Sequence, residues 1–303
     1  MEVGSTRSWD ELLPDALGLI FKNLPLQELL TVVPTVCKSW GKAVMGPYCW
    51  QEIDIEEWSN RSEPGSVERM LRMLIARSNG SIHKLCVSGL QNEPVFSLIA
   101  ENARSLRILC LPQSNMSDSI VEKIAGSLSM ITFLDLSYCY KISARSLEAI
   151  GKNCKLLEGL RRNMHPLIME ERLSQDNEEA HAIATTMPNL KRLETAYLRY
   201  INTIGALEII HSCPQLEYLD LRGCWQVKLD GEYLKDKFPK LKVLGPYVVD
   251  RYERNNDYED WSDFSDSLYD YESSDDENRF GELEFRFYQQ FNEDATNGWP
   301  PSP

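Results

Sequence analysis

Thiols and imidazoles are the most reactive side chains in this 303-residue sequence, and their spacing argues against a catalytic or metal-binding role. The cysteines form no Cys-x-x-Cys pair, and the histidines share no spacing typical of metal ligands. Zinc sites depend on such closely spaced ligands, and no glycine-rich phosphate loop occurs either. We therefore expect no catalytic residue, no metal and no cofactor. The side chains concerned are Cys37, Cys49, Cys86, Cys110, Cys139, Cys154, Cys213 and Cys224, with His83, His165, His181 and His211.

Four of the cysteines have a structural explanation. A catalytic thiolate needs basic groups or a helix terminus beside it. Cys139, Cys154, Cys213 and Cys224 instead occupy equivalent places in a repeated pattern, after a strand or at the end of a helix. The start of the chain is acidic and lacks an apolar leader segment, so we expect reduced, mostly buried thiols in the nucleus or the cytoplasm.

The negative charge of the chain is concentrated at its C-terminal end. The formal net charge is -14; residues 250–303 hold 16 acidic and 4 basic residues, and the rest holds 30 and 28. A nearly neutral body lacks the surplus of Lys and Arg that binding to nucleic acid requires. No run of about 18 apolar residues occurs, so no membrane span is expected. Residues 250–276 are acidic and poor in aliphatic side chains, which predicts disorder. Residues 280–291 fit a helix and a strand equally well.

An L-x-x-L-x-L pattern recurs seven times in the middle of the chain. The copies begin at residues 82, 106, 131, 157, 190, 216 and 241, so five of the six intervals are 24 to 26 residues and one is 33. Amphipathic helical patterns lie between them. A strand–helix unit of this size cannot bury its apolar side alone and must stack on its neighbours. The recurrence predicts a solenoid with a parallel sheet, and Trp50, Ile53 and Ile55 fit a degenerate first copy.

Segments such as LDLSYCYKISARSLEAIGKNCKLL resemble cysteine-containing leucine-rich repeats. The resemblance implies an α/β, right-handed leucine-rich-repeat solenoid whose sheet forms the concave face. The 33-residue interval holds about eight extra residues, including Pro166, and insertions in solenoids usually form loops on one face.

Residues that flank the inward leucines of each strand must form the concave face. They are small and neutral in the early copies, but charged and aromatic in the later ones. Since Tyr and Arg are typical anchors of protein interfaces, we interpret the later ones as a substrate-binding surface for a target protein. The alternative is that a solvated sheet face simply requires polar residues. The predicted substrate-binding residues are Arg161, Arg192, Glu194, Tyr218, Asp220 and Arg222.

The stretch Trp9 to Trp50 has the periodicity of short helices. Leu13, Leu17, Ile20, Phe21 and Leu24 form one apolar stripe. The prolines suggest that the first helix starts at residue 14 and ends before residue 25, that residue 34 ends the second helix, and that the third opens at residue 35. Three short helices of about forty residues cannot bury all this apolar surface among themselves, so we expect a partner to cover part of it.

This stretch resembles the F-box, through Leu13-Pro14, through Ile20-Phe21-Leu24 and through the run from Val36 to Trp40. The resemblance implies docking to the Skp-family adaptor of a cullin-RING ubiquitin ligase. The alternative is a helical bundle without such a partner. The residues that the resemblance assigns to adaptor binding are Leu13, Pro14, Leu17, Ile20, Phe21, Leu24, Val36, Cys37, Lys38 and Trp40.

Together these patterns predict four segments: a flexible N-terminus (1–8), an F-box (9–49), leucine-rich repeats (50–249) and a largely disordered acidic aromatic tail (250–303). The predicted function is that of a non-catalytic substrate receptor of an SCF-type ubiquitin ligase, which brings a target protein to ubiquitination and proteasomal degradation. The alternative function is a repeat-based scaffold or sequestering protein without a role in degradation.

Overall fold

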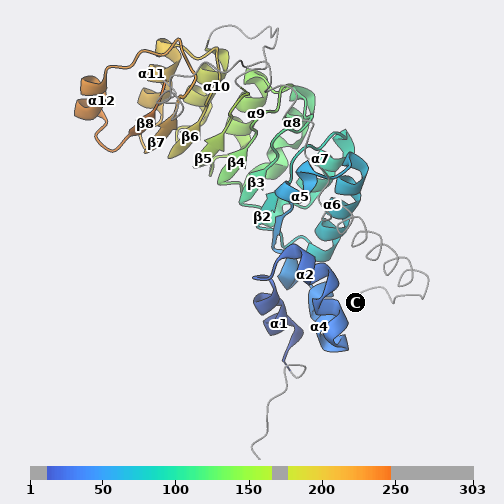
Figure 1. Cartoon of the computed structure of the whole chain (residues 1–303). Coiled ribbons are helices and arrows are strands. Elements are labelled where there is room, and N and C mark those ends of the chain that lie inside the picture. Colours follow the sequence, from blue (N-terminus) through green and yellow to red (C-terminus); the bar gives the residue numbers. More distant parts are fainter. Residues whose placement is uncertain (1–11, 166–176, 247–303) are drawn as a thin grey trace, which may run out of the picture.

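The structure, a computed structural model, describes residues 12–165 and 177–246. A small helical unit comes first, and a curved array of strand–helix repeats follows it (Figure 1). The eight strands form one parallel sheet in chain order, β1 to β8. The predicted α/β class, with short N-terminal helices followed by a repeat solenoid, is confirmed. The predictions for residues 166–176, 250–276 and 280–291 lie outside the described residues.

The N-terminal helical unit, residues 12–50, is held together by a small apolar core. Leu17 and Phe21 of α1 are buried in it, and the ring of Phe21 lies 4.8 Å from that of Trp40. The indole N–H of Trp50 donates a 2.7 Å hydrogen bond to the carbonyl of Val44. The elements of the unit are α1 (Pro14–Phe21), α2 (Leu26–Thr31), α3 (Val33–Val36), α4 (Lys38–Met45) and the 3-10 helix η2 (Pro47–Trp50).

The prediction that Pro34 ends the second helix, and that the third opens at Thr35, is wrong. Pro34 lies in the first turn of α3 instead, where the missing N–H of a proline has no helical acceptor to lose. The real break is at Cys37, which has extended backbone angles (φ -162°, ψ 168°), so that α4 begins at Lys38. Pro34 therefore lies at the beginning of a short helix, whereas the sequence pattern suggested that it ends one.

The array repeats one unit of a three-residue strand and a helix. The central residue of each strand from β1 to β7 points inward and is buried, while its neighbours face the concave side. The degenerate first copy is confirmed, because β1 pairs with β2 in register. The strands are β1 (Glu52–Asp54), β2 (Lys84–Cys86), β3 (Ile108–Cys110), β4 (Phe133–Asp135), β5 (Gly159–Arg161), β6 (Arg192–Glu194), β7 (Tyr218–Asp220) and β8 (Lys242–Leu244).

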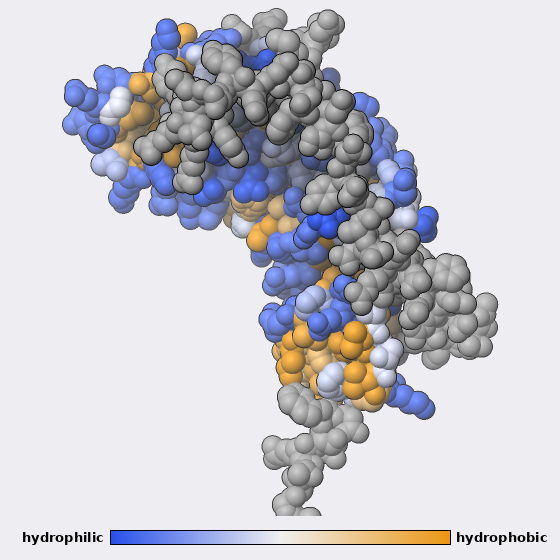
Figure 2. Space-filling view, viewed as in Figure 1, coloured by the Kyte–Doolittle hydropathy of each residue, from blue (hydrophilic) through white to orange (hydrophobic). Residues whose placement is uncertain are grey.

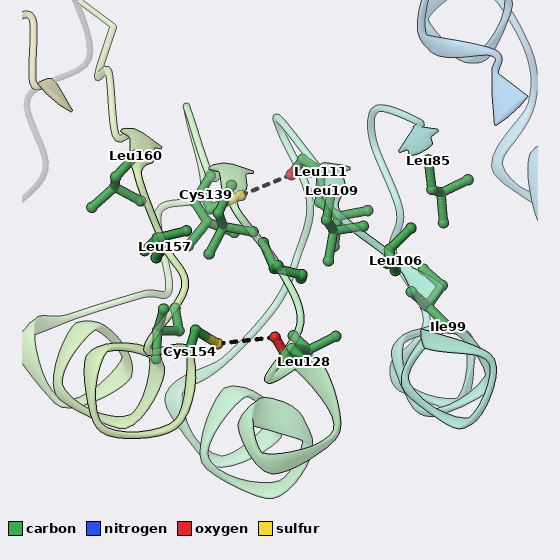
Figure 3. Packing of buried hydrophobic residues seen from close by; sticks show 14 of the residues in the cluster. Leu85, Ile99, Leu106, Leu109, Leu111, Leu128, Cys139, Cys154, Leu157 and Leu160 are labelled. Carbon is green, nitrogen blue, oxygen red and sulfur yellow. Dashed lines mark hydrogen bonds between the residues drawn. The ribbon is translucent and has the colours of Figure 1, made fainter. Parts of the chain in front are cut away.

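Helices on the outer side of the curve cover the back of the sheet (Figure 1). Figure 3 shows strand leucines such as Leu109 and Leu160 and helix residues such as Leu128 in the space between the sheet and the helices, and all three belong to one continuous core. The elements are α5 (Glu56–Asn60), α6 (Pro64–Ser78), α7 (Glu93–Glu101), η3 (Ala103–Ser105), α8 (Asp118–Ile124), η4 (Ala125–Leu128), α9 (Ala144–Asn153), α10 (Glu178–Thr186), α11 (Thr203–Ser212) and α12 (Gly231–Lys237). No helix among the described residues is long and apolar enough to span a membrane.

The repeat that contains β5 has a charged residue where the preceding repeat has Leu136 and the following one has Thr195. Arg162 stands at the third inward position of the pattern, and its side chain is fully buried. The guanidinium donates hydrogen bonds to the carbonyls of Cys139 (3.1 Å) and Ile142 (3.0 Å). It also forms an ion pair with Glu179 of α10 at 3.2 Å. The interrupted leucine pattern therefore contains a buried polar link between a strand and the helix that follows the insertion.

Candidate functional site: an apolar N-terminal surface and a charged concave face

The N-terminal helical unit exposes an unusual amount of apolar surface. Of the ten large apolar side chains that are exposed in the described part of the chain, six belong to this unit. Figure 2 shows the corresponding orange region at the lower end of the molecule, over α1 and α4. Exposed apolar surface that gathers in one place typically marks a protein interaction site. This apolar docking surface consists of Leu12, Leu13, Leu19, Ile20, Val32 and Val36.

The ten residues assigned to adaptor binding divide into three groups by exposure. Leu17 and Phe21 lie inside the unit, so they position α1 and cannot contact a partner without rearrangement. The sequence pattern did not separate these groups, since all the apolar residues of α1 share one broad stripe. The exposed members are Leu13, Pro14, Ile20, Val36 and Lys38, and the half-buried ones are Leu24, Cys37 and Trp40.

Local geometry fixes which side of α1 faces outward. Pro14 opens the helix, and Leu13 immediately before it is 73% exposed. Gly18 faces inward at a point of very close approach, because a Cβ there would come within 2.7 Å of the Cβ of Tyr48 in η2. Only a glycine allows α1 to pack so closely against the segment that leads into the repeats. The inward residues thus hold the outward face of Leu13 and Ile20 in place.

The six residues predicted for target binding come together on the concave side of three adjacent strands. The registers place Arg192 of β6 beside Tyr218 of β7, and Arg161 of β5 beside Glu194 of β6. The sequence prediction that these positions share one face is therefore confirmed; their role in binding a target stays a prediction. We call Arg161, Arg192, Glu194, Tyr218, Asp220 and Arg222 the charged concave surface.

A chain of ion pairs organises this surface. Arg161 lies between two buried carboxylates, with 2.9 Å to an oxygen of Asp135 and 2.8 Å to one of Glu194. Arg192 reaches the second oxygen of Glu194 at 2.7 Å. Burial acts to raise the pKa of Glu194, but hydrogen bonds from Arg161 and Arg192 outweigh it and hold that pKa below its usual range. The carboxylates of Asp135 and Glu194 thus form ion pairs with arginines of the protein itself.

Aromatic rings complete the charged concave surface. The guanidinium of Arg192 lies 4.0 Å from the ring centre of Tyr218, a distance at which a cation is attracted to the face of the ring. The guanidinium of Arg161 lies 5.5 Å from the ring centre of Phe133. That ring occupies the space a side chain at Gly159 would need, since a Cβ there would come within 2.5 Å of it.

Arg222, two residues after the end of β7, pairs with the buried carboxylate of Asp220 at 2.6 Å. The arginines at residues 192 and 222 remain exposed, so the surface offers cationic groups and an aromatic ring over anchored carboxylates. Sequence reasoning missed Asp135 and Phe133 as members of this network. The spacing of the repeats could have revealed them, because Phe133 and Asp135 occupy the positions that Gly159 and Arg161 occupy one repeat later.

The described residues also include the thiols of the chain and other potential metal ligands. No group of three or more Cys, His, Asp or Glu side chains in this part of the chain could hold a metal ion. Seven of the eight cysteines are buried, which agrees with the predicted mostly buried thiols. Burial raises the pKa of Cys154 and Cys213 to about 11 and that of Cys224 to about 12. The fold and its two surfaces are those of a leucine-rich-repeat protein with an N-terminal docking unit.

Comparison with known proteins agrees with this class. F-box protein FBW2 of Arabidopsis thaliana is 53% identical over 312 aligned residues, which cover 98% of both chains. F-box protein SKIP1 of the same organism is 34% identical, over 78% of this chain and 85% of its own. Putative F-box/LRR-repeat protein 23 is 31% identical, over 78% of this chain and 53% of its own. No protein-family model matches the chain. The chain belongs to the family of F-box proteins with leucine-rich repeats, and its N-terminal helical unit is the F-box.

Proposed function

We propose that this protein is a substrate-receptor subunit of an SCF-type ubiquitin ligase. In this proposal the apolar docking surface binds the Skp-family adaptor, and through it the cullin. The charged concave surface holds the target protein, whose ubiquitination leads to proteasomal degradation. The chain itself makes and breaks no bond. It brings target lysines close to a ubiquitin-conjugating enzyme, which raises their effective concentration.

The exposed apolar side chains of the F-box carry the proposal. Burying a Leu or Ile that would otherwise be exposed contributes about 1.5–3 kcal/mol, so an adaptor that covers Leu13, Ile20 and Val36 gains several kcal/mol. Leu17 and Phe21 are buried inside the same unit and hold the exposed residues of α1 in place. The membership of the F-box family, as given by the relatives, supports an adaptor as the partner.

Replacement of Leu13 and Ile20 by Ala tests the adaptor contact. Both side chains are exposed, so the variant should keep its melting temperature while adaptor binding falls at least tenfold, because about 2–4 kcal/mol of apolar contact is lost. Ile204→Ala is the matched control: Ile204 lies on α11 of the repeats and is 73% exposed, as Leu13 is. Adaptor binding by the Leu13 and Ile20 variant at the wild-type level would refute the proposed docking surface.

The proposed target site is tested by reversing charge on the charged concave surface. Arg192→Glu combined with Arg222→Glu should remove target binding and leave adaptor binding unchanged, since the two surfaces lie on different parts of the chain (Figure 1). The candidate targets are proteins that accumulate on the receptor when a neddylation inhibitor keeps the ligase inactive. Undiminished binding of such a target by the charge-reversed variant would place the target site elsewhere.

The same experiment separates the proposed role from its alternative, a scaffold or sequestering protein. A target of a ligase should accumulate in cells and on the receptor when neddylation is blocked. A scaffold partner should bind equally with and without the inhibitor, and its cellular level should not change.

A further inference from the structure

The buried cysteines differ in what their thiols contact. Five of them donate to backbone carbonyls inside the core, as Figure 3 shows for Cys139 with Leu111 (3.1 Å) and Cys154 with Leu128 (3.3 Å). These thiols fill core positions, and each has a backbone acceptor. The others of this kind are Cys49, Cys213 and Cys224.

Cys86 and Cys110 are arranged differently, because they stand opposite each other on adjacent strands. They occupy the last positions of β2 and β3 and are directly opposite in the register of these parallel strands. The neighbouring Cys110 side chain, together with burial, raises the pKa of Cys86 well above its usual value. Both side chains face the concave side and keep a small exposure, 4% for Cys86 and 7% for Cys110.

The geometry of the two strands suits a disulfide bond. Neighbouring strands lie about 4.8 Å apart, and disulfides join residues whose Cα atoms are about 4.4–6.8 Å apart. The Cβ atoms of a disulfide lie about 3.8 Å apart, which is closer than the strands themselves. Cys86 and Cys110 are directly opposite in the register, so their side chains leave neighbouring strands at the same level.

We propose that Cys86 and Cys110 form an oxidisable dithiol on the concave face, which hydrogen peroxide converts to a disulfide. The thiol of Cys110 reacts first with the peroxide and yields a sulfenic acid and one water. The sulfur of Cys86 then attacks the sulfenic sulfur, forms the S–S bond and releases a second water. Two thiols lose two electrons and two protons in all, and one peroxide is reduced to two waters. This modification site is independent of the function proposed above.

The surroundings of the pair determine how the reaction depends on pH. The thiolate is the reactive form of a cysteine. The ammonium group of Lys84 favours the Cys86 thiolate, whereas the carboxylate of Asp54 and the neighbouring thiol oppose it. Lys84 itself pairs with Asp54 at 2.7 Å. The influences that oppose the Cys86 thiolate outweigh that of Lys84, so the pKa of Cys86 is raised. Oxidation should therefore be slow at neutral pH and should become faster as the pH rises.

The test is peptide mapping of the full chain after treatment with hydrogen peroxide and alkylation of the remaining thiols. Trypsin separates the two residues, since Arg104 and Arg107 lie between them. The expected product is a cross-linked pair of peptides that lacks two hydrogens, forms faster at pH 8.5 than at pH 7, and is reversed by dithiothreitol. Cys154→Ser should give the same product, because Cys154 bonds to a carbonyl of the core.

Cys110→Ser should leave Cys86 without a cross-link under the same treatment. The proposal is overturned if both cysteines of the wild-type chain remain alkylatable, or if they are oxidised to sulfinic acids without a cross-link. A cross-link of either cysteine to a different residue overturns it as well.

Discussion

Arg161 connects two carboxylates that the fold has removed from water. Asp135 and Glu194 are both buried, and the guanidinium of Arg161 reaches each of them within 3 Å. Glu194 keeps a second partner in Arg192, whereas Asp135 does not have another ion pair among the described residues. A substitution at Arg161 should therefore affect stability, and not only recognition of a target.

Arg161→Met should lower the free energy of unfolding by about 2–3 kcal/mol, because an uncompensated buried carboxylate is costly. In an array of this size the melting temperature should fall by roughly 4–10 °C. The matched control is Arg145→Met, which removes an ion pair between exposed side chains, Arg145 and Glu122. Such pairs contribute about 0–1 kcal/mol, so an equal loss in both variants would contradict the role of Arg161.

The depressed pKa of Glu194 gives this prediction a pH dependence. A carboxyl with a lower pKa in the folded state stabilises the protein above its unfolded-state pKa of about 4.3. This contribution to stability is lost as the pH falls from about 4.3 through the pKa that Glu194 has in the folded state. Melting temperatures measured between pH 6 and pH 3 should therefore decrease less steeply for Arg161→Met than for the wild type, since the variant has lost the stabilising contact beforehand.

At the scale of elements, the buried pair of Arg162 and Glu179 joins β5 to α10 on either side of residues 166–176. Loss of one partner of a buried pair costs about 3–5 kcal/mol, while apolar replacement of both is often close to neutral. We expect Glu179→Leu to be strongly destabilising. Addition of Arg162→Leu should restore part of the loss, but not all, because the carbonyls of Cys139 and Ile142 lose their donor.

A double-mutant cycle of thermal or urea unfolding measures this coupling. Lys191 and Glu158 form a comparable pair on the surface, at 2.9 Å, and the same cycle there should give a coupling below about 1 kcal/mol. Additive effects at Arg162 and Glu179 would show that the pair does not hold the two elements together.

The elements of the array were predictable because their periodicity is set by burial alone. Each inward Leu must meet a helix, and the spacing of the strands followed from that requirement. The short helices of the F-box were less predictable, since Pro34 is compatible with both the end and the first turn of a helix. The backbone of Cys37, which decides between the two, leaves no mark in the sequence pattern.

The candidate sites, too, contain a part that the sequence could predict and a part that it could not. The shared face of Arg161, Arg192 and Tyr218 follows from the alternation of a strand. The pairing of those arginines with buried carboxylates depends on register between repeats, and so does the placement of Cys86 opposite Cys110. Neither can be derived from spacing within one repeat.

At the scale of the whole molecule, the two ends of the described array differ. The F-box covers the first repeat, with Trp50 buried between the two parts and the guanidinium of Arg77 of α6 lying 5.5 Å from its ring centre. At the far end, α12 contains no buried residue. Phe238 and Leu241 are only partly buried, and among the described residues no strand follows β8. Within the described residues the last repeat thus presents an open apolar edge, and such a terminal repeat opens more readily than interior repeats unless another segment covers it.

The sequence predicts that residues 280–291, which lie outside the described residues, cover this open edge as a cap. A chain that ends at residue 279 should then melt at a lower temperature than the full chain. Its amide hydrogens in α12 and β8 should exchange faster, since the apolar side of the last repeat loses its cover. Amides in α7 to α9 serve as the internal control and should exchange as before, because interior repeats contact only their neighbours. Equal melting temperatures and equal exchange in α12 and β8 for the two chains would refute the cap. Residues 280–291 would then be better explained as a segment that binds a partner.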